Sequence, residues 1–135
     1  MANLTILNGT VTVTGNTTVS RVQAGETIGQ GSAVYLKAAD SKYYNCEVST
    51  GAAEANCTGI AVTNGVTDGY FIMATTGSYV PGATLVLGET YVVSDGGAIS
   101  PIGDLTTGDY TTILFAATST TEGLLILSTT GVAKP

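Results

Sequence analysis

The sequence has no histidine, no tryptophan and few charged residues. Of its 135 residues only four are Lys or Arg and ten are Asp or Glu, which gives a formal net charge of −6. The cations (Arg21, Lys37, Lys42 and Lys134) form no basic cluster. Binding of nucleic acids depends on clustered Lys and Arg side chains that neutralise phosphates. The composition therefore argues against a nucleic-acid partner.

Long hydrophobic runs are also missing. Apolar runs such as Leu124 to Leu127 are far shorter than the roughly 20 residues that a membrane-spanning helix needs. The first ten residues, MANLTILNGT, lack the basic start and the continuous apolar stretch of a signal peptide. We therefore expect no membrane partner, and we expect synthesis in a cytoplasm.

The two cysteines, Cys46 and Cys57, flank the turn-like segment STGAAEAN. They could form a hairpin disulfide or remain two partly buried thiols, and a reducing compartment favours the thiols. Because the chain has no histidine, neither cysteine has the partner that nucleophilic catalysis or a common zinc site would use. The sequence predicts no metal, no cofactor and no enzymatic activity.

Carboxylates near loops are the remaining candidates for acid–base catalysis or Ca²⁺ binding. Asp104 and Asp109 flank a loop, and Asp95 precedes two glycines. Their spacing matches no EF-hand loop and no calcium-binding nonapeptide array. Asp before Gly is typical of turns, so these residues are interpreted as turn formers.

An internal repeat organises the chain. The segment GETIGQGSAVYL (25–36) shares its spacing of Gly, Thr and aliphatic residues with GATLVLGETYVV (82–93), at a constant offset of 57 (82 − 25). A second block, 59–77, aligns with 114–131 if one residue is deleted in a turn, which places Ala61 over Ala116. Self-similarity at a fixed offset indicates duplicated structural units. We predict two pseudo-repeated halves, 24–77 and 81–131, within a domain of residues 21–135.

Short strands and turns dominate from Arg21 onward. The expected strands are 33–37, 42–48, 57–62, 70–75, 85–87, 90–94, 112–118 and 124–129, separated by turns rich in Gly, Asp and Asn. Helical spacing of apolar residues is not sustained, and only Ala52 to Asn56 suggests one helical turn. The pattern predicts an all-β fold, a compact barrel or sandwich of short strands. Pro101 is expected to end a strand or to lie on a sheet edge.

Residues 1–20 have no counterpart before the second repeat. The alternating segments LTIL and TVTVT, separated by Asn8-Gly9, are typical of a β-hairpin. The segment could supply extra strands to the domain or form an arm that adds to a neighbouring sheet. An isolated hairpin would have little stability, so we favour the arm. The predicted partner contacts are its apolar residues Leu4, Ile6, Leu7, Val11 and Val13.

From Ala24 to the C-terminus the chain resembles small phage capsid decoration, or cement, proteins. The segments that carry the resemblance are AGETIGQGSAVYLKAADSKYYN, GIAV, GYFIMATTG, LVLGETYVVSDGGAISPIGDLTTGDYTTILFAAT and LLILSTTGVA. The resemblance implies a β-barrel-like subunit, commonly a homotrimer, on the outer surface of a phage head. Its implied partner is the major capsid protein, which it braces, and its implied location is the virion.

The alternative is a receptor- or glycan-binding module of a phage fibre or bacterial surface protein. Such a module would expose aromatic side chains together with Asp or Asn on one loop face. The seven tyrosines could supply that face, although tyrosines spread over strands are also typical of packed residues with one polar end in water.

Overall fold

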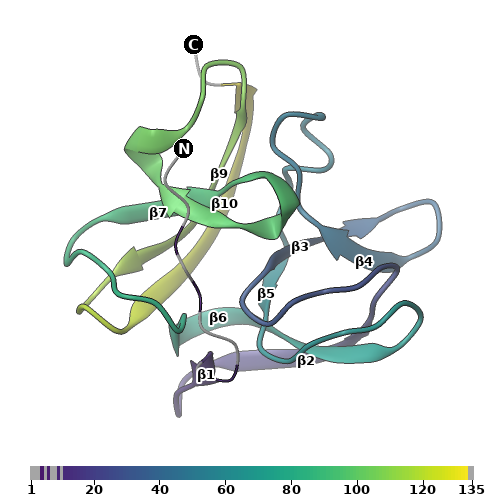
Figure 1. Cartoon of the computed structure of the whole chain (residues 1–135), viewed down its shortest axis with the longest axis horizontal. Helices are drawn as coiled ribbons and strands as arrows, with labels where there is room; N and C mark the ends of the chain where they lie inside the picture. The colour runs from purple at the N-terminus through teal and green to yellow at the C-terminus, as the bar shows by residue number, and fades with distance from the viewer. Residues whose placement is uncertain (1–3, 5, 7–8, 10, 134–135) are drawn as a thin grey trace.

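The computed structural model describes residues 4, 6, 9 and 11–133 of the chain (Figure 1). Its regular elements are β1 (Thr12–Val13), β2 (Thr18–Gln23), β3 (Ala33–Lys37), β4 (Lys42–Asn45), β5 (Gly59–Ala61), β6 (Tyr70–Val80), β7 (Thr90–Val93), η1 (Asp95–Gly97), β8 (Ile99–Pro101), η2 (Ile102–Asp104), β9 (Tyr110–Ala117) and β10 (Gly123–Ala133). The only helical elements of the described residues are the two short 3-10 turns, so the predicted all-β fold is confirmed.

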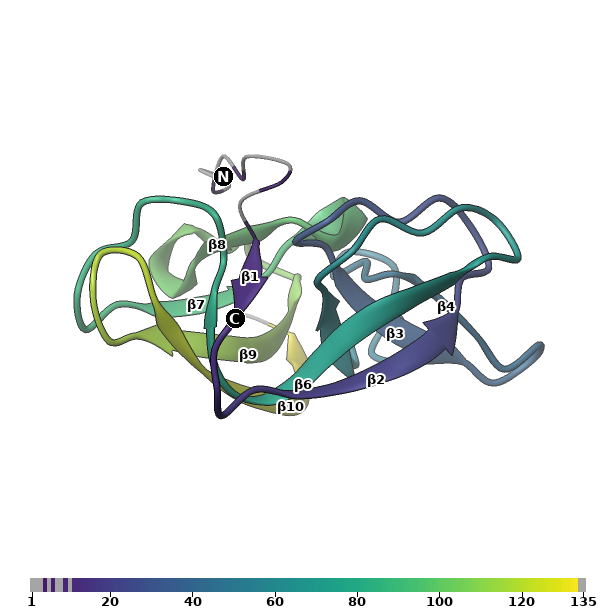
Figure 2. The same cartoon turned by 90° about the horizontal axis from the view of Figure 1, so that it is seen from below.

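The strands form one curled, ten-stranded antiparallel sheet (Figure 2). Its order is β4-β3-β5-β6-β10-β9-β7-β8. The first half pairs β3 with β4 and β5, and β5 with β6. The second half pairs β7 with β8 and β9, and β9 with β10. The two halves therefore share one pairing scheme and meet at the β6–β10 pair.

In β5 and β9 the structural repeat differs by one residue from the sequence alignment. Ala33 pairs with Ile60, and its counterpart Thr90 pairs with Ala116. The offset in these strands is therefore 56 (116 − 60), and Ala61 corresponds to Ala117 rather than to Ala116. A shift by one residue exchanges the two faces of a strand, so the pairing and not the matching letters defines the equivalence.

Most expected strands lie where the sequence predicts them, with one clear exception. Leu85 to Leu87 form no strand, because this segment enters a turn in which Glu89 donates its N–H to the carbonyl of Val86. Strand β8 ends at Pro101 and pairs only with β7, so the expected edge position of this proline is confirmed.

The N-terminal segment lies along the body of the same molecule. Thr12 and Val13 pair with Val80 and Tyr79 of β6, and β2 follows β1 along that strand. Leu4 donates its N–H to the carbonyl of Ile99 in β8 at 2.7 Å. The described residues of this segment therefore supply extra strands to the sheet, while Leu7 and Asn8 of the predicted hairpin lie outside the described residues.

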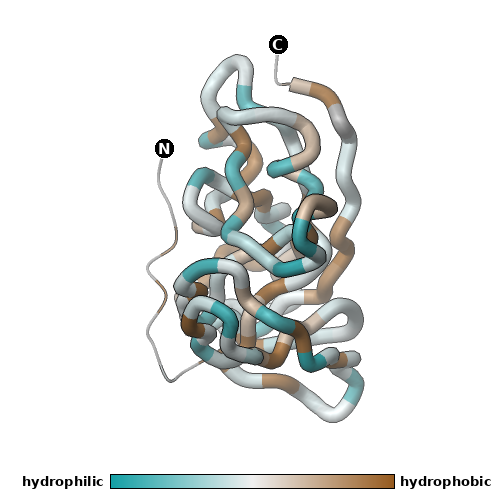
Figure 3. Tube along the Cα trace, turned by 90° about the vertical axis from the view of Figure 1, so that its right-hand side faces the viewer, coloured by the Kyte–Doolittle hydropathy of each residue, from teal (hydrophilic) through white to brown (hydrophobic). Residues whose placement is uncertain are grey.

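The core consists of two apolar clusters. The larger one spans both halves and contains Phe115, which stacks on Tyr91 at 5.1 Å and meets Tyr79 edge-on at 5.4 Å. The smaller cluster lies within the first half around Phe71. Hydrophobic and hydrophilic segments are interspersed along the trace (Figure 3), as expected for strands with one buried face. On β10, for example, Leu125 is buried.

Polar contacts connect the two halves. The carboxylate of Asp95, in the second half, accepts the N–H groups of Val48 and Ser49 at 2.7 and 3.0 Å and the Ser49 hydroxyl at 2.8 Å. Gly97 donates its N–H to the carbonyl of Cys46. Burial works against ionisation of Asp95, but the hydrogen bonds from Ser49 and Val48 outweigh it and lower the pKa of this carboxyl. The two halves therefore form one connected body.

Candidate functional site

An apolar groove lies between β1, β2, β6 and the segment that follows β5. Its volume is about 360 Å³ and its lining residues are Val11, Thr12, Val13, Val19, Val62, Thr63 and Ile72. Val13 and Val19 are 47% and 44% exposed. Their neighbours are exposed as well, because both residues of β1 and the first four residues of β2 lie outside the core. The lining contains no ionisable side chain, so the groove is suited to contact with another apolar surface.

Gln30 holds two walls of this groove in place. Its side-chain N–H groups donate to the carbonyls of Val62 at 2.7 Å and Val11 at 3.4 Å. Its side-chain oxygen accepts the N–H of Gly9. One amide side chain thus connects the N-terminal segment to the segment that follows β5, and both segments line the groove.

The structure separates the predicted partner-contact residues. Leu4 and Ile6 are partly buried and pack against the larger core cluster, and Val11 is buried within it. Val13 is exposed and lines the groove. Leu7 lies outside the described residues. Contact of these residues with a partner stays a prediction, and in the single chain only Val13 among the described ones offers a largely exposed side chain.

The sequence reasoning did not single out Val19, Val62 or Ile72. They come from three separate segments, and they meet because β2 pairs with β6 while Val62 donates its N–H to the carbonyl of Ile72. The sequence contains only a weak signal for this groove. Residues 1–25 contain a single charged side chain, Arg21, so an uncharged surface around this segment was predictable, but the residues that line the groove were not.

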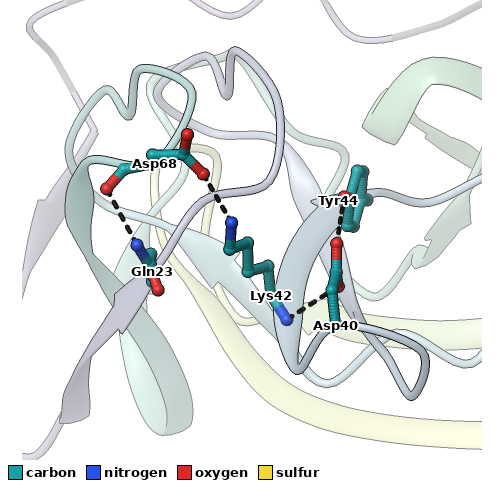
Figure 4. Close-up of polar contacts among 5 residues, drawn as sticks. All are labelled: Gln23, Asp40, Lys42, Tyr44 and Asp68. Carbon is teal, nitrogen blue, oxygen red and sulfur yellow. Dashed lines mark hydrogen bonds and ion pairs between the residues drawn. The ribbon is translucent and has the colours of Figure 1, made fainter.

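A second, polar cluster lies at the far end of the first half (Figure 4). Tyr44 donates its hydroxyl to the Asp40 carboxylate at 2.5 Å, and the Lys42 ammonium pairs with Asp68 at 2.6 Å. Gln23 donates to the carbonyl oxygen of Asp68. The hydrogen bond to Asp40 raises the pKa of Tyr44 to about 12. At neutral pH this tyrosine therefore stays protonated and serves as a hydrogen-bond donor.

The cations of the described residues all have local partners. The Arg21 guanidinium lies 4.4 Å from the centre of the Tyr70 ring, and the Lys37 ammonium lies 4.9 Å from the centre of the Tyr44 ring. Lys42 pairs with Asp68. Such contacts hold each charge against an aromatic face or a carboxylate, so within the described part of the chain no cluster of basic groups converges on an anion.

Cys46 and Cys57 are buried free thiols. The Cys57 thiol donates to the carbonyl of Gly59 at 3.1 Å. A hydrogen bond with Cys57, together with burial, raises the pKa of the Cys46 thiol. Reactive cysteines are thiolates at ordinary pH, so these are packing residues, as the favoured alternative predicted.

The described residues contain no group of three or more Cys, Asp or Glu side chains placed to hold a metal ion. None of the helices in the described part of the chain could cross a bilayer. Asp109 accepts the N–H of Thr106 within a turn, as its interpretation as a turn former requires.

Comparison with known proteins finds no family that matches this sequence and no curated protein that resembles it significantly. The resemblance to capsid decoration proteins therefore stays a prediction from the sequence pattern.

Proposed function

We propose that the protein is a structural capsid decoration, or cement, protein on the outside of a phage head, where it binds the major capsid protein. The observation that carries the proposal is the uncharged groove lined by Val13, Val19 and Ile72 on a connected β-sheet body. A protein that reinforces a shell needs a stiff body and a complementary surface, and it needs no reactive centre. The sequence resemblance supplies the identity of the shell and the expected homotrimer.

Mass action explains how such a protein would work. A ligand that binds one state of an assembly and not the other shifts the equilibrium towards the bound state. Bound at many equivalent positions, the protein would stabilise the mature shell. Apolar contact would supply most of the affinity, since desolvating an uncharged groove costs little.

Capsid occupancy tests this proposal. Val13→Asp and Val19→Asp place a charge in the groove from exposed positions, so folding should survive. Val132→Asp, on the exposed face of β10, is the matched control. We expect the two groove variants to be lost from purified heads in co-sedimentation, while the control binds as the wild type does. Full occupancy by folded groove variants would contradict the proposal.

A receptor- or glycan-binding module is the second candidate function. It is favoured by Tyr70, which is 55% exposed and follows Asp68 by two residues in the chain. Against it, Arg21 and Lys37 already lie over the Tyr70 and Tyr44 rings, which would otherwise stack on sugar rings. Binding of the isolated protein to a glycan array, abolished by Tyr70→Ala, would support this candidate in place of the first.

A further inference from the structure

Within the described residues, strand β2 has one edge with no strand partner, because it pairs with β6 alone. The end strands of the main sheet each accept a backbone hydrogen bond from elsewhere in the chain: Gly25 donates its N–H to the carbonyl of Tyr43 in β4, and Leu4 donates its N–H to the carbonyl of Ile99 in β8. An open strand edge is a template for another strand.

The alternation of hydrogen bonds shows which groups point outward. Ile72 gives its carbonyl to the N–H of Val62 and its own N–H to the Thr63 hydroxyl, on the side of β6 away from β2. Its partner Arg21 is therefore in a non-hydrogen-bonded pair, with N–H and carbonyl pointing away from β6. The same reasoning applies to Val19. Its partner Ala74 lies two residues after Ile72 and also pairs with Ile60 of β5, so the N–H and carbonyl of Ala74 point towards β5 and those of Val19 point outward.

The charge distribution indicates what can approach this edge. Residues 1–25 contain no acidic residue, and neither does β6, although the whole chain carries a net charge of −6. Two copies of the chain repel each other over most of their surfaces. That repulsion is weakest where both present this acid-free edge, because interactions between exposed charges are largely screened beyond about 8–10 Å.

We propose that β2 pairs with β2 of a second copy, antiparallel and about a two-fold axis that passes through Ser20. Such a contact is isologous, so each copy offers the same surface. In this register Val19 and Arg21 of one copy exchange their outward N–H and carbonyl groups with Arg21 and Val19 of the other. The sheet then continues from one molecule into the next. This inference does not depend on the proposed capsid function.

Charge distinguishes this register from the one with its axis shifted by one residue. An axis through Arg21 would set the two guanidinium groups directly opposite each other, and like charges in that position are destabilising. With the axis at Ser20, each Arg21 side chain lies against Val19 of the second copy, at the rim of the apolar groove. The two Ser20 residues form a close, non-hydrogen-bonded pair.

Cysteine cross-linking of the purified full-length protein tests the register. Cβ atoms of directly opposed residues lie about 4.5–5.5 Å apart, so Ser20→Cys should form a disulfide-linked dimer under mild oxidation by oxidised glutathione. Thr18→Cys is the control on the same strand. The two copies of residue 18 would be roughly 13 Å apart, four residues along the strand. Equal cross-linking of the two variants, or none, would overturn the proposal.

Sedimentation at increasing concentration provides the second arm. Arg21→Pro removes an outward N–H that β6 does not use, which edge positions tolerate. Arg21→Ala keeps that N–H and removes the charged side chain together with its contact to the Tyr70 ring. We expect loss of the dimer in Arg21→Pro and its retention in Arg21→Ala. A wild type that stays monomeric at all concentrations, or a dimer unaffected by Arg21→Pro in a folded variant, would overturn the proposal. Protection of the Val19 amide by an added capsid-protein peptide alone would assign the edge to that partner instead.

Discussion

The two halves of the molecule share a strand-pairing scheme but differ in what covers them. In the first half, the turn before β3 lies under the N-terminal segment: a Cβ on Gly31 would meet Ile6 at 2.8 Å. The corresponding turn before β7 is open, with nothing within 4 Å of a Cβ on Gly88. Gln30 is tied into the groove, whereas its counterpart Leu87 is 67% exposed.

This difference shows that the N-terminal segment breaks the symmetry of the repeat. Backbone conformation is kept, since Gly31 and Gly88 have φ values of 89° and 82°. The turn bonds are kept as well: Ser32 donates to Gly29, and Glu89 donates to Val86. The environment differs: the two turns share their backbone conformation, and the groove described above lies in the half that the N-terminal segment covers. Four experiments test this comparison.

The largest effect is expected in the aromatic core. Phe115→Ala removes a fully buried ring that contacts both Tyr79 and Tyr91, and should lower the free energy of unfolding by about 3–5 kcal/mol. Phe71→Ala, in the first half, removes a ring that contacts Tyr43 edge-on at 6.4 Å and should cost less. Urea unfolding followed by circular dichroism measures both. A larger loss for Phe71→Ala would show that the first half holds the dominant core.

Alanine at the paired glycines should separate backbone strain from packing. Gly88→Ala should cost about 1–2 kcal/mol, because only the left-handed backbone is strained. Gly31→Ala carries the same strain and additionally displaces Ile6 and Val11, an overpacking cost of about 1–3 kcal/mol more. Thermal and urea denaturation of the two variants measure the difference. Equal losses would mean that the N-terminal cover adds nothing at this turn.

Exchange of the paired turn residues should have a smaller effect. Gln30→Leu leaves the carbonyl of Val62 without its side-chain donor and should destabilise the protein by about 1–3 kcal/mol. Leu87→Gln, the reciprocal change at an exposed position, should stay within about 0.5 kcal/mol. Urea unfolding gives both values, and proteolysis of the N-terminal segment should accelerate only in Gln30→Leu. Unchanged proteolysis in Gln30→Leu would show that Gln30 does not hold the N-terminal segment against the sheet.

The smallest effect is expected in the loss of folding stability at acidic pH. The folded-state pKa of Asp95 is lowered, so its contribution is present above the unfolded pKa and is lost as pH falls through the folded value. Asp95→Asn should therefore cost about 1 kcal/mol at pH 7, as befits exposed charged contacts, and almost nothing near pH 2. The free energy of unfolding from pH 2 to 7 measures this. Asp104→Asn, in the η2 turn, is the matched control for the removal of one carboxylate.

Much of the fold could be predicted from local pattern. The alternation of apolar residues and the Gly-rich turns located strands such as Ala33–Lys37 at their observed bounds, because side-chain period and turn chemistry are local properties. The candidate site could not be predicted in the same way. Val19, Val62 and Ile72 meet through pairing of distant strands, and Leu4 and Ile6 are apolar whether they face a partner or their own core.

The sequence alone determined the fold class of this protein through its duplicated short strands, and it determined the low charge and the lack of histidine. These properties follow from residue type and local spacing, which need no tertiary contact. Tertiary structure alone decided the register of the repeat, the cover on one half and the open edge of β2. Hydrogen bonds between strands far apart in sequence determine those features, and a shift of one residue, as between Ala116 and Ala117, changes which side chains face the core.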